Sequence, residues 1–165
     1  MRHAAVCMAI LMLVTLASFA SIGIGVKLVN GNTFCVTGEL GGERLSVELD
    51  IGLRSVNVPG VFNWTMIWVS GVARLAFPMG SFAPYVGLGG IGVNINLDSA
   101  EGRGSLNAFG ITGEGGLRYS LEEIGFPLHL SVGPNISWIP VAGEVENIGI
   151  GGVGLGWHIG ATLPF

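Results

Sequence analysis

The amino-acid sequence predicts an all-β protein, an eight-stranded antiparallel up-and-down transmembrane β-barrel that is preceded by a signal peptide. Three observations lead to this prediction. Half of the 165 residues are hydrophobic and only 11% are charged, whereas about a quarter of the residues in an ordinary soluble domain are charged. The chain begins with a basic, then apolar segment, and the remainder alternates between apolar and polar residues with a period of two.

The N-terminal segment is typical of a secretory signal peptide. Arg2 and His3 precede a long apolar run, which ends in the small-x-small cleavage motif Ser18-Phe19-Ala20. We therefore expect residues 1–20 to be removed and residues 21–165 to form one barrel domain. The uncharged stretch is also long enough for a membrane-spanning helix. Glycine alternates with branched residues directly after it, however, which favours a strand and hence cleavage.

Eight segments of the mature chain are expected to be strands, because apolar residues recur at every second position between turn signals. In residues 44–54, for example, every odd position is aliphatic and every even position is polar or glycine. At about 3.3 Å per residue, the longer segments can cross an apolar band of about 25 Å when tilted. The eight segments are residues 22–29, 33–40, 44–54, 65–77, 84–97, 106–121, 127–139 and 153–165.

The connections between these segments predict which end of the barrel lies on which side of the membrane. Membrane barrels have short turns on the side of the two termini and longer loops on the other side. The short turns are expected at residues 41–43, 78–83 and 122–126, and the longer loops at residues 55–63, 98–104 and 140–149. Asn30-Gly31-Asn32 is expected to form a tight hairpin turn on the loop side.

Aromatic residues are expected to form a girdle at each membrane boundary. On the side of the termini these are Phe77, Phe82, Tyr85, Tyr119, Phe126 and Phe165, and on the other side Phe34, Phe62, Trp64, Phe109 and Trp138.

Charge decides which face of the strands meets lipid. The apolar row carries no charge, and the opposite row carries four basic and four acidic residues, a set that would make a poor water-facing surface. A narrow lumen suits it better, because buried charges must be paired. We therefore expect a luminal charge network, with Lys27, Glu39 and Arg54 near the rims and Glu48, Asp50, Arg74, Glu114 and Arg118 inside. If the apolar row pointed inward instead, the chain would be a soluble lipocalin-like carrier.

The C-terminal segment ends in Phe165 and has apolar residues at alternate positions before it, although Pro164 removes one backbone donor near the end. This pattern resembles the small bacterial outer-membrane β-barrel family, whose familiar members are the eight-stranded OmpA- and OmpX-type barrels. The resemblance implies an outer-membrane location and contact with outer-membrane lipid and lipopolysaccharide. It also implies recognition by the barrel-assembly machinery through an insertion signal, which consists of Trp157, Ile159, Leu163 and Phe165.

Other classes of partner are not expected. The net charge of -4 and the lack of a basic patch argue against nucleic acid. No cofactor is predicted, and His3, His129 and His158 lack the spacing of a metal site. We expect a monomer.

The specific activity stays open at this point. The crowded lumen favours a structural or surface-interaction role over a narrow porin-like channel. His129-Leu-Ser131 resembles the His-x-Ser site of outer-membrane lipid A deacylases, with Glu144 or Glu146 as a third member. The alternation turns His129 and Ser131 into the lumen, where a lipid ester cannot reach, so we do not expect an enzyme.

Overall fold

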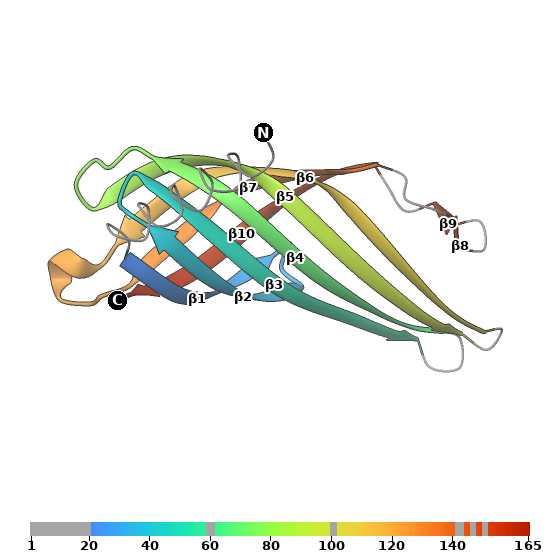
Figure 1. Ribbon diagram of the computed structural model, residues 1–165. Helices are drawn as coiled ribbons and strands as arrows, with labels where there is room; N and C mark the ends of the chain where they lie inside the picture. Colours follow the sequence, from blue (N-terminus) through green and yellow to red (C-terminus); the bar gives the residue numbers. More distant parts are fainter. Residues whose placement is uncertain (1–20, 59–61, 100–101, 141–143, 146–147, 150–151) are drawn as a thin grey trace, which may run out of the picture.

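The computed structural model describes residues 21–58, 62–99, 102–140, 144–145, 148–149 and 152–165, so the predicted signal peptide lies outside the described residues. Eight long strands form a closed antiparallel barrel in the order β1-β10-β7-β6-β5-β4-β3-β2, with consecutive long strands side by side (Figure 1). The long strands are β1 (Ser21–Val29), β2 (Thr33–Gly41), β3 (Leu45–Val58), β4 (Phe62–Ala76), β5 (Phe82–Ser99), β6 (Gly102–Ser120), β7 (His129–Ile139) and β10 (Gly152–Pro164). The predicted fold class is confirmed.

Three short elements lie in the connections. The 3-10 helix η1 (Glu122–Ile124) precedes β7, and the strands β8 (Glu144–Val145) and β9 (Ile148–Gly149) pair with each other in a separate sheet. No helix in the described part of the chain is long and apolar enough to cross a membrane.

The first hairpin forms where the sequence predicts a tight turn. The connection is the three residues Asn30, Gly31 and Asn32, since Val29 pairs with Thr33. Asn30 and Gly31 have φ angles of 53° and 69°, the positive values that a type I′ turn requires and that asparagine and glycine adopt most readily. The Asn30 side chain also accepts a hydrogen bond from the backbone N–H of Trp157 (2.9 Å), so the turn is tied to β10.

The outer wall of the barrel is apolar. Leu49 and Ile51 of β3 are 59% and 60% exposed, and Leu155 of β10 is 78% exposed. Glu48 and Asp50, which alternate with Leu49 and Ile51 on β3, are almost completely buried. This polarity is opposite to that of a soluble carrier, whose aliphatic residues line the interior. Since lipid tails offer no hydrogen bonds, the closed sheet is also what satisfies the backbone N–H and C=O groups in a bilayer.

The strands differ greatly in length, and the longest ones rise above the barrel rim. β2 pairs with β3 only as far as the Phe34–Leu53 pair, and β6 pairs with β7 only as far as the Ile111–Trp138 pair. Beyond these pairs β3, β4, β5 and β6 continue together as a four-stranded sheet (Figure 1). We call residues 53–58, 62–67, 94–99 and 102–107 the projecting sheet; it lies at the end opposite the C-terminus.

Two of the predicted loops are therefore wrong. Residues 55–63 and 98–104 are largely strand, because β3 ends at Val58, β4 begins at Phe62, β5 ends at Ser99 and β6 begins at Gly102. The remaining connections, residues 59–61 and 100–101, are shorter than residues 121–128 on the side of the C-terminus. The expected difference in loop length between the two sides does not hold for these two hairpins.

The lipid-facing row can be tested on one strand. Leu49→Arg places a charge at the middle of the apolar row of β3 and should lower the free energy of unfolding in lipid vesicles by about 2–4 kcal/mol. Asn57→Arg, on the same row of β3 but in the projecting sheet, should cost much less. Denaturant titration of both refolded variants measures the difference, and equal stability would contradict the assigned position of the membrane.

Candidate functional site

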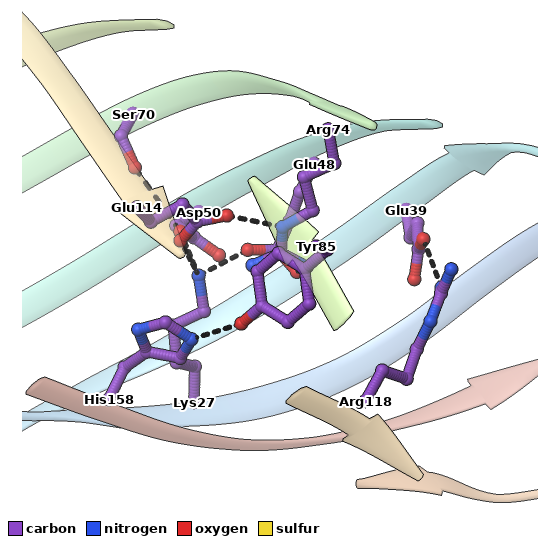
Figure 2. A network of polar contacts seen from close by, with 10 residues as sticks. All are labelled: Lys27, Glu39, Glu48, Asp50, Ser70, Arg74, Tyr85, Glu114, Arg118 and His158. Carbon is purple, nitrogen blue, oxygen red and sulfur yellow. Dashed lines mark hydrogen bonds and ion pairs between the residues drawn. The ribbon is translucent and has the colours of Figure 1, made fainter. Parts of the chain in front are cut away.

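Five charged side chains meet at the centre of the lumen (Figure 2). The Lys27 ammonium donates to Glu48 and to Asp50 Oδ2 (2.8 Å), and lies 3.5 Å from Glu114 Oε2. The Arg74 guanidinium donates to both Glu48 and Glu114. All five side chains are at most 6% exposed. We call them the central network; it links β1, β3, β4 and β6 across the lumen.

Smaller polar groups extend the central network. The Ser70 hydroxyl donates to Asp50 Oδ2 at 3.2 Å. Tyr85 Oη lies 2.5 Å from His158 Nε2, and the Arg74 guanidinium carbon lies 4.8 Å from the centre of the Tyr85 ring. Tyr85 of β5 is 4% exposed and His158 of β10 is 0% exposed. Their contact links these two strands to the central network (Figure 2).

Glycines on the inner wall leave space for the long charged side chains. A Cβ atom on Gly87 would lie 3.1 Å from Glu114 Cγ, 3.2 Å from Arg74 Cγ and 2.7 Å from Val72 Cγ1. Any larger residue at this position would therefore displace both partners of the Arg74–Glu114 pair.

A second ion pair lies apart from the central network (Figure 2). It lies toward the mouth on the side of the C-terminus, because Glu39 is in register with Gly23 and Gly23 with Pro164. Arg118 Nη1 donates to Glu39 at 2.7 Å, and Arg118 Nη2 donates to the backbone carbonyl of Glu43 at 3.3 Å. The Arg118 and Glu39 side chains are 15% and 11% exposed. This pair borders an open cavity of about 530 Å³, whose lining also includes Glu122 and His129.

The structure thus arranges the eight predicted luminal charges differently from the expectation. Lys27, expected near a rim, lies in the central network, and Arg118, expected inside, pairs with Glu39 at the mouth. Arg54 stacks over the Trp64 ring, 5.5 Å from its centre. Among the described residues, Arg54 has no ion pair.

Tyr85 is the clearest error of the sequence reasoning. Its place in the girdle is wrong, because the ring lies inside the lumen and not at the membrane boundary. The alternation of β5 contains the signal, since Tyr85 shares its side of the strand with the buried Ile91 and Val93. Tyr85 was expected in the girdle because it is aromatic and lies near a strand end, although its odd position places it on the luminal side of β5. No pattern in the sequence links Tyr85 to His158.

Above the central network, the inner wall becomes apolar. Met66, Ile95 and Leu106 form one cross-strand row, and Trp68, Val93 and Ala108 form the row below it. Val93 and Ala108 are 8% and 2% exposed. We call these six residues with Trp64 the apolar cluster; they lie on the inner face of β4, β5 and β6 near the outer mouth. The place of Trp64 in the predicted girdle is therefore wrong, because its ring lies on the inner face beneath Arg54. Arg54 of β3 is in register with Met66, so the inner wall also carries one positive charge at this level.

The residues of the deacylase-like motif are not brought together. His129 Nε2 lies 3.4 Å from Glu122 Oε1, and Ser131 is in register with Arg118 on the neighbouring strand. Glu144 belongs to β8, beyond the opposite end of β7 (Figure 1). The eleven residues of β7 span roughly 35 Å at about 3.3 Å per residue, so Glu144 is far from His129. Glu146, the other expected third member, lies outside the described residues.

A closed eight-stranded antiparallel barrel with an apolar outer wall and a charged lumen is the fold of the small outer-membrane β-barrels. Solved structures share it. The N-terminal β-barrel domain of Pseudomonas aeruginosa OprF has 15% sequence identity and a TM-score of 0.64, with 88% of this chain and 96% of that chain covered. Neisserial surface protein A (NspA) has 12% identity and a TM-score of 0.63, with 88% and 94% covered.

A third solved structure is Ail, the attachment invasion locus protein of Yersinia pestis, with 14% identity, a TM-score of 0.55, and 88% and 97% of the two chains covered. No protein-family model matches the chain, and no curated protein matches it. The similarity to eight-stranded outer-membrane barrels that the C-terminal segment predicts is confirmed at the level of the fold.

The space that Gly87 leaves can be tested with a matched pair. Gly87→Val should crowd Arg74 and Glu114, and we expect it to cost about 1–3 kcal/mol of stability, as overpacking generally does. Gly90→Val is the control, because Gly90 is exposed and its nearest atom to an added Cβ is 3.9 Å away. Thermal unfolding in detergent should separate the two variants, and equal melting temperatures would contradict the role given to Gly87.

The mouth ion pair can be tested by exchanging its charges. Arg118→Glu opposes two carboxylates and should lower stability by about 2 kcal/mol, the order expected for a lost charged hydrogen bond. The double variant with Glu39→Arg restores opposite charges, so part of the loss should return. Folding yield and melting temperature measure both effects. If Arg118→Glu behaves as the unmodified protein does, the pair has no structural role.

Proposed function

We propose that the chain is an integral protein of the bacterial outer membrane that has a structural and surface-interaction role. The observation that carries this proposal is the projecting sheet, because four strands continue beyond the closed barrel and hold a large polar surface away from the membrane. NspA and Ail, which share the fold, are named as a surface protein and an attachment protein. Their names agree with such a role and say nothing of a partner for this chain.

The contents of the lumen support a closed barrel over a channel. The central network crosses the interior in the middle, and the bulky side chains of the apolar cluster lie on the inner face above it. We expect no discrete conductance steps when the refolded protein is added to a planar bilayer in which a porin gives them. Reproducible steps from the folded form would contradict the closed lumen and favour a narrow channel.

Assembly through the C-terminal strand is part of the same proposal. Trp157, Ile159 and Leu163 of β10 and Phe165 directly after it have side chains that are between 46% and 77% exposed. An accessory protein can therefore reach these side chains before lipid covers them. We propose that the barrel-assembly machinery recognises them and that the folded barrel is a monomer surrounded by lipid.

The placement of the projecting sheet outside the cell can be tested by chemical labelling. Cys35 is completely buried, so it should contribute little background. Ser105→Cys, in the projecting sheet, should react with a membrane-impermeant maleimide on intact cells. Glu123→Cys, in η1 at the opposite end, should react only after the cells are opened. Labelling with the opposite preference would reverse the orientation, and labelling of neither variant in folded protein would contradict a spanning barrel.

A further inference from the structure

The outward face of strands β3 to β6 changes its chemistry along one line. Four cross-strand rows follow one another from the barrel wall into the projecting sheet. In order they are Ile51, Val69, Gly92 and Phe109; Leu53, Ile67, Asn94 and Asn107; Ser55, Thr65, Asn96 and Ser105; and Asn57, Asn63, Asp98 and Arg103. The first row is apolar, the second is half amide, and the last two are wholly polar.

This change of polarity places the outer boundary of the membrane between the first row and the last two rows. Phe109, which is 74% exposed, stands at the line as barrel aromatic residues do at membrane interfaces. The inner face changes in the opposite sense at the same height, from the central network to the apolar cluster. Where a sheet extends from lipid into water, its outer face must change from apolar to polar, because water replaces the acyl chains around it.

The polar part of the outward face is built mainly from amides and hydroxyls. Asn96 Nδ2 donates to Asn94 Oδ1 and Asn94 Nδ2 donates to Asn107 Oδ1, both at 2.7 Å. These bonds hold the three amides in one line across β5 and β6. Beside this line the surface is hollowed into an open cavity of about 550 Å³, which Asn63, Thr65, Asn96 and Ser105 help to line.

The face is nearly free of net charge. Asp98 and Arg103 are in register and form an ion pair at 3.2 Å. A phosphate group would have to compete with Asp98 for the Arg103 guanidinium. Neutral groups that both donate and accept hydrogen bonds, such as sugar hydroxyls, fit a surface of amide and hydroxyl side chains better.

The position of this face determines which molecules lie beside it. The outward rows below the line meet the acyl chains of lipid, and the rows above it continue on the same strands without a break. From the Asn94 row to the Asp98 row the face extends about 13 Å along the strand. The molecules whose tails contact the wall must therefore present their headgroups to this face.

We propose that the outward face of the projecting sheet, centred on Asn94, Asn96 and Asn107, binds the saccharide part of outer-leaflet lipopolysaccharide. The inference rests on the proposed outer-membrane location and adds to it a lipid-binding surface. The contacts are hydrogen bonds to sugar hydroxyls rather than ion pairs to phosphate. Lipid bound in this way would brace the projecting sheet where β2 and β7 no longer flank it.

The experiment compares two lipids that share lipid A and differ in the core oligosaccharide. The protein is refolded in phosphatidylcholine vesicles that contain either lipopolysaccharide with a complete core oligosaccharide or the same lipid truncated to lipid A. Bound lipid is counted by native mass spectrometry after gentle extraction. We expect several-fold more retained lipid with the complete core, and a loss of this preference in the triple variant Asn94→Ala, Asn96→Ala, Asn107→Ala. Glu123→Ala at the opposite mouth should keep it.

Each outcome bears on the proposal. Equal retention of both lipids by the unmodified protein would overturn it, as would a triple variant that folds and keeps the preference. Hydrogen exchange of residues 94–107 in the unmodified protein gives a second measurement, since protection should rise only with the complete core. Folding in phosphatidylcholine alone is scored separately by heat-modifiable gel mobility. A failure there would overturn the proposed membrane location, whereas lost saccharide preference with intact folding would overturn only the lipid-binding surface.

Discussion

The need of every backbone N–H and C=O group for a partner in hydrocarbon governs this structure. A β-sheet can meet that need only if it closes, because an open edge would leave a row of unpaired groups in lipid. Closure gives each strand one face toward lipid and one toward a narrow lumen, so neighbouring residues must differ in polarity. The uncharged outer wall and the buried central network are two consequences of this one constraint.

The same constraint explains why the projecting sheet can exist. Above the membrane, water satisfies free strand edges, so β3 to β6 no longer need β2 and β7 beside them. The polarity of the two faces is exchanged at the same height, and the apolar cluster turns inward as the core of a water-soluble sheet does. Strand pairing therefore continues without interruption while the surrounding medium changes from lipid to water.

Most of the fold could be predicted from the sequence because period-two alternation is a local signal. It defined the eight strands and the residues that face the lumen. The strand ends in the projecting sheet could not be found in this way, because the alternation changes phase there and Asn57 and Asn63 are typical turn residues. The Tyr85–His158 contact joins residues 73 positions apart across the lumen, and such a pairing depends on strand order and tilt. The exact partners of Lys27, Arg54 and Arg118 depend on the same geometry.

The central network also helps to specify the register in which neighbouring strands pair. A slip of one residue in any strand exchanges its two faces, so a slipped β1 would carry Lys27 into lipid and a slipped β4 would carry Arg74 there. Each cation costs about 2–4 kcal/mol at the bilayer centre, and the carboxylates left behind would lose their partners as well. Buried ion pairs of this kind contribute little net stability when compared with apolar packing. Their effect on alternative pairings is much larger, because a slip leaves charges in lipid and carboxylates without partners in addition to turning the aliphatic row into the lumen. The charges thus reinforce the register that the alternation of apolar and polar rows already favours.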